Sequence, residues 1–149
     1  VRVLLDDVLE PTTRLVDLYC GVGMFGAALA ASVGSVVGVE WSRSSVADAE
    51  RNLASVVGTV TRCDVNRWRP EPADVVVADP ARDGLGPKAV DVIRRTGCRA
   101  LALVSCDAGA LGRDARLLED AGFSYDRSVV VDLFPQTHHV EVVTRFTRR

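Results

Sequence analysis

The stretch "RLVDLYCGVGMFGAALAASV" (residues 14–33) decides the fold of this chain. It begins with an apolar run typical of a buried strand, passes through three glycines with the spacing GxGxxG, and ends in a small, apolar, helix-forming segment. Glycines in such a turn let the backbone bend sharply and come close to a ligand that faces the start of the next helix. The stretch therefore predicts a strand–turn–helix unit that binds a small molecule.

The rest of the chain repeats this alternation of strand and helix. Its strands read as continuous Val, Leu and Ala runs, which is typical of a parallel sheet covered by helices on both faces. The last two strands have no helix between them, which favours antiparallel pairing. We expect an α/β, doubly wound, Rossmann-like fold with a mostly parallel seven-stranded sheet and an antiparallel last strand. The predicted strands are 14–20, 35–40, 59–64, 73–80, 98–106, 128–135 and 139–148, and the predicted helices are 24–33, 44–56, 88–96 and 110–122.

Length and composition narrow the class of protein. The 149 residues fit one domain over 1–149, and the first residue, Val1, predicts that this domain is the C-terminal part of a longer chain. No apolar run approaches the roughly 20 residues of a membrane span, and no leader is visible, so we expect a cytoplasmic protein with no membrane partner. The four cysteines form no CxxC pair, which argues against a metal site. The net charge of −2 gives no support for nucleic-acid binding.

Carboxylates at predicted strand ends indicate which cofactor the turn binds. Glu40 ends the second strand, 19 residues after Gly21, where a carboxylate accepts both hydroxyls of an adenosine ribose. Asp17 precedes the glycines Gly21 and Gly23. It would repel the pyrophosphate of NAD, but it favours the sulfonium and ammonium groups of S-adenosylmethionine (SAM). Asp64 ends the third strand and either binds the adenine amino group or caps a turn. The sequence therefore predicts a SAM site rather than an NAD site.

Further motifs at later strand ends resemble one known family. In order along the chain, and together with the glycine turn, they look like the successive motifs of the RNA uracil-C5 methyltransferases, which make 5-methyluridine in tRNA and ribosomal RNA. The resemblance covers about residues 10–149 and implies the fold of class I SAM-dependent methyltransferases. The motifs are Asp17-Leu-Tyr-Cys-Gly-Val-Gly, Asp79-Pro-Ala-Arg82, Ser105-Cys106-Asp107, Leu111-Gly-Arg-Asp114 and His139-Val-Glu141.

The resemblance implies a set of roles for these residues. Uracil C5 is a poor nucleophile until a thiolate adds to C6, and a base must later remove the C5 proton. By resemblance, Cys106 is the nucleophile and Glu141 the base, and Tyr19, Glu40 and Asp79 are SAM-contacting positions. Asp79 would orient either the cofactor or the uracil. The implied partner is a tRNA or ribosomal RNA, bound by a monomer without a metal ion.

Other functions compete with this hypothesis. An amino-group RNA methyltransferase usually has an aromatic residue after its acidic-Pro-Pro motif, where Arg82 stands here. An NAD-dependent oxidoreductase is disfavoured by Asp17. A catalytically silent RNA-binding fragment of the same fold is the third alternative. The chain also departs from the family: Ala81 replaces a second proline, and the upstream glutamine and RNA-binding region of the family have no counterpart in these 149 residues.

Several side chains near the motifs carry simpler expectations. Arg82 either binds a phosphate or pairs with Asp79 or Asp83. Arg113 and Asp114 are expected to pair or to cap their own helix locally. His138 and His139 either contact substrate, orient Glu141 or lie in a solvated turn. Packing roles are expected for Met24, Phe25 and Trp41.

Overall fold

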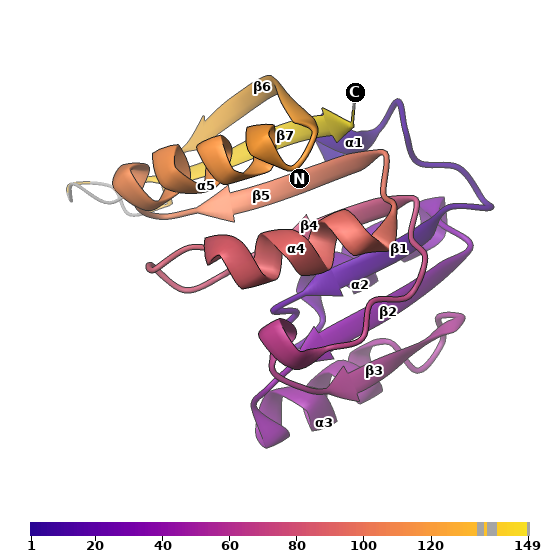
Figure 1. Ribbon diagram of the computed structural model, residues 1–149. Coiled ribbons are helices and arrows are strands. Elements are labelled where there is room, and N and C mark those ends of the chain that lie inside the picture. Colours follow the sequence, from indigo (N-terminus) through magenta and orange to yellow (C-terminus); the bar gives the residue numbers. More distant parts are fainter. Residues whose placement is uncertain (134–135, 137–139, 149) are drawn as a thin grey trace.

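The computed structural model describes residues 1–133, 136 and 140–148 (Figure 1). Within them, seven strands form one sheet in the order β3-β2-β1-β4-β5-β7-β6. Every neighbouring pair from β3 to β5 is parallel, whereas β7 runs antiparallel to both β5 and β6. The strands are β1 (Arg14–Leu18), β2 (Ser35–Glu40), β3 (Gly58–Arg62), β4 (Val75–Ala78), β5 (Ala100–Ser105), β6 (Phe123–Val131) and β7 (Glu141–Arg148).

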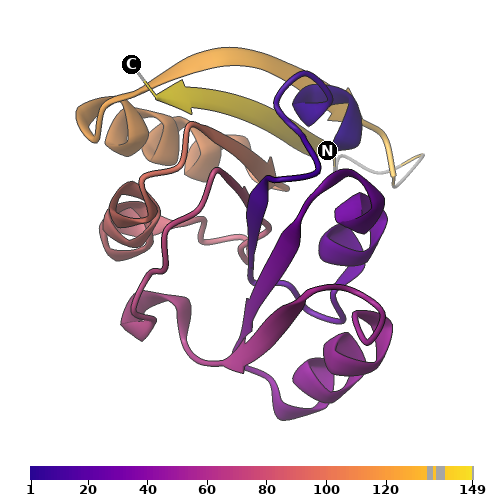
Figure 2. The same cartoon turned by 90° about the vertical axis from the view of Figure 1, so that its right-hand side faces the viewer.

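Helices cover both faces of this sheet, as the doubly wound prediction requires. Figure 2 shows α4 and α5 on one side of the sheet and α1, α2 and α3 on the other. Neighbouring strand residues face opposite layers, so that Leu15 packs in one apolar core and Val16 in the other. The helices are α1 (Arg2–Leu5), α2 (Met24–Leu29), α3 (Arg43–Asn52), α4 (Gly86–Thr96) and α5 (Ala108–Asp120), with 3₁₀ turns η1 (Ala30–Ser32) and η2 (Val65–Arg67).

The strand order reverses between β1 and β4. From β1 the chain winds outward through β2 to β3, and from β4 it winds the other way through β5. Ligands of open α/β sheets bind at the carboxyl ends of the strands beside such a reversal. The fold therefore places the expected site where β1, β4 and their neighbours end.

Some predicted boundaries were wrong. The expected helix over 24–33 ends at Leu29 and continues only as η1, and the expected helix over 44–56 ends at Asn52. The strand expected over 128–135 begins earlier, at Phe123, because Gly122 turns the chain with φ +91° directly after α5. Residues 124–130 of this edge strand are largely exposed, so the apolar signal that marks a buried strand is missing there. The end predicted at 134–135 lies outside the described residues.

The amino-terminal segment is tied to the far end of the sheet. Leu4 and Leu5 of α1 are buried. The carbonyl oxygen of Leu4 accepts hydrogen bonds from Arg145 Nη1 (2.9 Å) and Arg127 Nη2 (3.3 Å), and both arginines form ion pairs with Asp7. Because these arginines lie on β7 and β6, residues 1–9 form a strap that the last two strands hold in place. The sequence patterns did not predict this strap.

Candidate active site

The glycine turn after β1 is built from left-handed backbone conformations. Gly21 and Gly23 have φ of 54° and 81°. Tyr19, which lies in the chain between the end of β1 and these glycines, has φ of 58°. A positive φ is routine for glycine but uncommon for a bulky side chain, so Tyr19 holds a strained conformation. A Cβ on Gly26 would lie 2.9 Å from Val36 Cγ1, so this glycine lets α2 pack closely on the sheet. No atom lies within 4 Å of a Cβ built on Gly21, so space is open above the turn.

Asp17 lies buried beneath this turn. Its Oδ2 accepts a hydrogen bond from the Gly26 N–H at 2.9 Å, whereas its Oδ1 has no hydrogen-bond partner among the residues that the structure describes. Burial raises the pKa of Asp17 to about 7, and the negative charge of Asp79 adds to the increase. A buried acceptor without a partner is costly, so the site favours a ligand that brings a donor or a positive charge to Oδ1. This observation fits the SAM hypothesis.

Glu40 connects the turn to the next helix. Its Oε2 accepts the Gly21 N–H at 3.0 Å, and its Oε1 accepts the Ser42 N–H at 2.6 Å. Ser42 in turn caps α3 by accepting the Ser45 N–H. Each carboxylate oxygen has further lone pairs, so Glu40 is fixed in position and still able to accept the two hydroxyls of a ribose.

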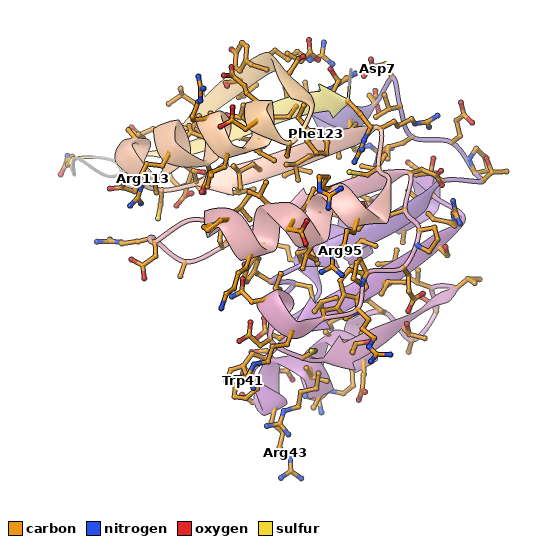
Figure 3. All side chains as sticks on the ribbon, in the orientation of Figure 1. Asp7, Trp41, Arg43, Arg95, Arg113 and Phe123 are labelled. Atoms are coloured by element: carbon orange, nitrogen blue, oxygen red, sulfur yellow. The ribbon has the colours of Figure 1, made fainter. Side chains whose placement is uncertain are left out.

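The packing expected of Trp41 and Met24 was wrong. Their exposed fractions are 66% and 59%, while Phe25 is partly buried against the core as expected. Trp41 follows Glu40 directly, and the guanidinium of Arg62 lies 5.8 Å from its ring centroid. Figure 3 shows Trp41 at the side of the molecule where β2 ends. An exposed aromatic ring beside a ribose-binding carboxylate is a candidate contact for adenine, and the sequence analysis missed it.

Tyr19 and Asp64 follow β1 and β3, and the charge of Asp64 acts on the tyrosine. Asp64 Oδ1 accepts the Asn66 N–H at 2.9 Å, so the carboxylate caps η2 as one of its two expected roles requires. Burial raises the pKa of Tyr19 to about 12, and the negative charges of Asp64 and Asp114 contribute. The tyrosine is therefore a neutral, half-buried side chain with a hydroxyl group next to the turn.

Cys106, Glu141 and Asp79 lie at the ends of neighbouring strands. Ser105 and Val142 form the last pair in the antiparallel ladder of β5 and β7, so Cys106, directly after β5, and Glu141, the first residue of β7, each lie next to this pair. Asp79 directly follows β4, the neighbour of β5. Its pKa is raised by burial and by the negative charge of Glu141. Three chemically active groups from distant parts of the sequence thus lie at the same end of the sheet, on neighbouring strands.

The other cysteines differ from Cys106 in burial. Cys20 and Cys98 are buried, and burial raises the pKa of both thiols, that of Cys20 to about 12. Cys106 and Cys63 are half-buried. The burial of Cys20 and Cys98 is typical of cysteines that serve as small apolar core side chains. Cys106 directly follows β5 and Cys63 directly follows β3, and both strands end at the side of the sheet where the glycine turn lies.

Two aspartates that follow Cys106 in the chain each cap the start of a helix. Asp107 caps α5 by accepting the Ala110 N–H at 2.7 Å. The local cap expected of Asp114 was wrong. Its buried carboxylate reaches across to α4 and accepts the N–H groups of Leu85 (2.7 Å) and Gly86 (3.0 Å).

Two arginines near the motifs have different surroundings. Arg113 donates to the Asp83 carbonyl oxygen at 3.4 Å. Arg82 is exposed, and neither of its two expected ion pairs, with Asp79 or with Asp83, forms. His138 and His139 lie outside the described residues.

Three negative observations concern only the parts of the chain that the structure describes. No helix there is long and apolar enough to cross a membrane. No group of three or more His, Cys, Asp or Glu side chains in those same residues is arranged to hold a metal ion. A depression of about 350 Å³ between α3 and β3 is lined by none of the predicted site residues.

The chain is similar to RNA methyltransferases in sequence. Residues 4–71 match the family described as tRNA (Uracil-5-)-methyltransferase. An uncharacterized RNA methyltransferase of Streptomyces avermitilis is 40% identical over 85% of this chain and 31% of the relative. The 23S rRNA (uracil(1939)-C(5))-methyltransferase RlmD of Klebsiella pneumoniae is 36% identical over 95% of this chain and 34% of the relative. The chain thus spans about a third of the length of these curated relatives.

Solved structures agree with the sequence comparison. The tRNA (uracil-54, C5)-methyltransferase of Pyrococcus abyssi, in complex with S-adenosyl-L-homocysteine, has a TM-score of 0.84 and 29% identity over 96% of this chain and 36% of that chain. The N-methyltransferase NodS of Bradyrhizobium japonicum has a TM-score of 0.80 at 13% identity, covering 99% of this chain and 90% of that chain, and shows the fold alone. By sequence and by fold, this chain is similar to RNA uracil-C5 methyltransferases, and it has the class I SAM-dependent methyltransferase fold.

Proposed function

We propose that this chain is the catalytic region of an enzyme that transfers a methyl group from SAM to C5 of a uridine in RNA. The observation that supports the proposal is the pairing of Ser105 with Val142 in β5 and β7, which brings the residues beside this pair, Cys106 and Glu141, to the end of the sheet where the glycine turn lies. The similarity to RNA uracil-C5 methyltransferases supports the same reaction and an RNA substrate. The family resemblance also supports residues 1–149 as one catalytic domain of a longer enzyme, working in the cytoplasm as a monomer without a metal ion.

We expect the cofactor to be held by the carboxylates and glycines of the turn after β1 and of the neighbouring strand ends. Asp17 Oδ1 offers an acceptor to a positively charged ammonium group, and Glu40 offers its remaining lone pairs to the ribose hydroxyls. Gly21 and Gly23 leave room for close approach, and Tyr19, Asp64 and Asp79 border the same space. When bound, SAM supplies an electrophilic methyl group on a sulfonium.

The protein's own residues would then perform two steps. The Cys106 thiolate would add to uracil C6, which makes a covalent S–C6 bond and leaves an enolate. C5 of this enolate would take the methyl group, while the methyl–sulfur bond breaks and its electron pair stays on the sulfur of the departing S-adenosylhomocysteine. Glu141 next takes the proton from C5, and the electron pair of that C–H bond re-forms the C5–C6 double bond as the thiolate leaves. The target uridine must leave its base stack to reach this edge.

A covalent trap tests this proposal. RNA that carries 5-fluorouridine at the target position has fluorine in place of the C5 proton, so elimination is blocked and the S–C6 bond persists. We expect mass spectrometry to find a protein–RNA adduct on the peptide that contains Cys106 when SAM is present. The variant Cys106→Ala should form no adduct. An adduct that persists in Cys106→Ala, or methylation of a base amino group instead of C5, would overturn the mechanism.

A second variant separates the two steps. Glu141→Gln keeps the size of the side chain but cannot accept the C5 proton. We expect it to form the covalent adduct with ordinary uridine RNA and to release product at least a hundredfold more slowly than the unaltered chain, since general base catalysis contributes about 10²–10⁴-fold. Unchanged product release in Glu141→Gln would remove Glu141 from the reaction.

A further inference from the structure

One face of α5 leads directly away from the candidate nucleophile. The helix begins at Ala108, two residues after Cys106, and residues 109, 112, 113 and 116 fall on the same side of it at helical spacing. These residues, together with Leu117, line a surface depression of about 680 Å³. We call Gly109, Gly112, Arg113 and Arg116 the α5 arginine face. It starts at the reaction site and runs outward along the helix.

The two glycines leave the helix backbone bare. Both are exposed, and a Cβ built on Gly112 would meet no atom within 4 Å. A glycine in a helix interior lowers helix stability by about 1 kcal/mol relative to alanine. Helix stability therefore does not explain the glycines on this face. A bulky chain such as a ribose–phosphate backbone can lie against α5 at these positions.

The charges on this face are positive. The Arg116 side chain is 73% exposed and pairs with Asp120, at the far end of α5. Figure 3 shows Arg113 at the beginning of α5, and its hydrogen bond to Asp83 brings the loop that carries the unpaired Arg82 next to it. The nearby carboxylates are largely engaged: Asp107 accepts the Ala110 N–H and Asp114 is buried against α4, which leaves Asp83 exposed.

We infer that the α5 arginine face, with Arg82 beside it, binds the sugar–phosphate backbone of RNA next to the target uridine. Planar guanidinium groups match phosphate geometry with paired hydrogen bonds. The position of the face fits this partner, because a strand whose uridine reaches Cys106 must continue from that point over neighbouring surface. This inference rests on the proposed function and adds the surface that positions the substrate.

The test is the salt dependence of RNA binding by the whole chain. A fluorescently labelled single-stranded RNA that contains the target uridine is titrated with the unaltered chain and with the double variant Arg113→Gln/Arg116→Gln. Two lost phosphate contacts should reduce the slope of log K against log[salt] by about 1.4 and weaken binding roughly tenfold at low salt. The matched control is Arg94→Gln/Arg95→Gln, which makes the same charge change at the opposite end of α4, where both arginines pair with Asp91.

The outcomes separate this inference from the proposed function. SAM affinity, measured by calorimetry, should be equal in all three proteins, and Arg113→Lys/Arg116→Lys should recover part of the RNA affinity. An RNA affinity and salt slope that stay unchanged in the Gln double variant, or that fall equally in the control, would overturn the inference while the 5-fluorouridine adduct still supports the reaction. An unaltered chain that binds SAM but no RNA would overturn the inference too. Should the Gln double variant lose SAM binding, the exposed single change Arg116→Glu decides by the same measurements.

Discussion

Asp17 illustrates how one residue carries both the fold and the cofactor hypothesis. Its Oδ2 holds the start of α2 through the Gly26 N–H, while Oδ1 lies buried without a partner. Burial raises its pKa to about 7, so near neutral pH the carboxyl group is close to half ionised. An ammonium group beside Oδ1 would stabilise the ionised form and lower this pKa.

We therefore predict that SAM binding strengthens as the pH rises through 7. At a pH below the pKa of Asp17, its carboxyl group is neutral and attracts the cationic cofactor weakly. At a pH above this pKa, the carboxylate is already ionised in the free protein and attracts the cofactor more strongly. Calorimetry should show Kd decreasing from pH 6 to pH 8. Asp17→Asn should remove most of this pH dependence and raise Kd at pH 8 roughly tenfold, equivalent to about 1.4 kcal/mol. The control Asp48→Asn, on the exposed surface of α3, should behave like the unaltered chain.

Trp41 offers an optical measurement of the same site. Of the two tryptophans, Trp41 is 66% exposed beside Glu40, whereas Trp68 is 5% exposed in the core. We predict that SAM changes the fluorescence of the chain through Trp41. Trp41→Phe should abolish most of the signal change, and Trp41→Leu, which removes the aromatic ring, should weaken SAM binding by about 1 kcal/mol, the size of one aromatic stacking contact. A full signal change that survives in Trp41→Phe would place the adenine elsewhere.

At the scale of elements, the sequence predicted what depends on local pattern. Apolar runs located all seven strands, because buried strands require apolar side chains. The glycine spacing located the turn, because a positive φ favours glycine. The role of Asp114 could not be predicted, since its partners Leu85 and Gly86 are 29 and 28 residues away in the chain. The same holds for the relative position of Cys106 and Glu141. The residue types suggested the pair by resemblance, but only strand pairing sets their register.

The cap that Asp114 provides for α4 yields a stability prediction. Asp114→Ala removes two charge-assisted hydrogen bonds and leaves the N–H groups of Leu85 and Gly86 without acceptors. We expect the free energy of unfolding to fall by about 3 kcal/mol in urea denaturation. The comparison variant Asp91→Ala loses only exposed ion pairs and should cost less than about 1 kcal/mol. Equal losses in the two variants would contradict the capping role.

At the scale of the whole molecule, the amino-terminal strap joins the two ends of the sequence. Residues 1–9 contact Arg127 of β6 and Arg145 of β7, which come more than 115 residues later in the chain. The Arg145 side chain is only 8% exposed and also forms an ion pair with Asp126. The last two strands therefore hold the beginning of the chain through their arginines, while Leu5 packs on the core residues of the central strands.

Loss of Arg145 should loosen the strap alone. In Arg145→Met, we predict that hydrogen exchange of the amides in residues 4–9 accelerates at least tenfold, because the Leu4 carbonyl and Asp7 lose their buried partner. The fully buried strands β4 and β5 should keep their slow exchange. Arg95→Met, which changes an exposed side chain, should leave the exchange of residues 4–9 as it is. Faster exchange throughout the sheet would mean that Arg145 supports the core rather than the strap.

The reversed direction of β7 has a consequence for how this chain tolerates change. Of the seven strands in the described part of the chain, β7 alone has its first residue, and not its last, at the edge where Cys106 lies. Glu141 thus arrives there through a hydrogen-bonded ladder whose side chains alternate between faces. Inserting or deleting a single residue within β7 would turn every later side chain to the opposite layer or pull Glu141 from its place. Among variants that keep their function, insertions and deletions in β7 should therefore be rarer than substitutions. A library that carries single insertions, deletions and substitutions at each position of β7 can measure this difference.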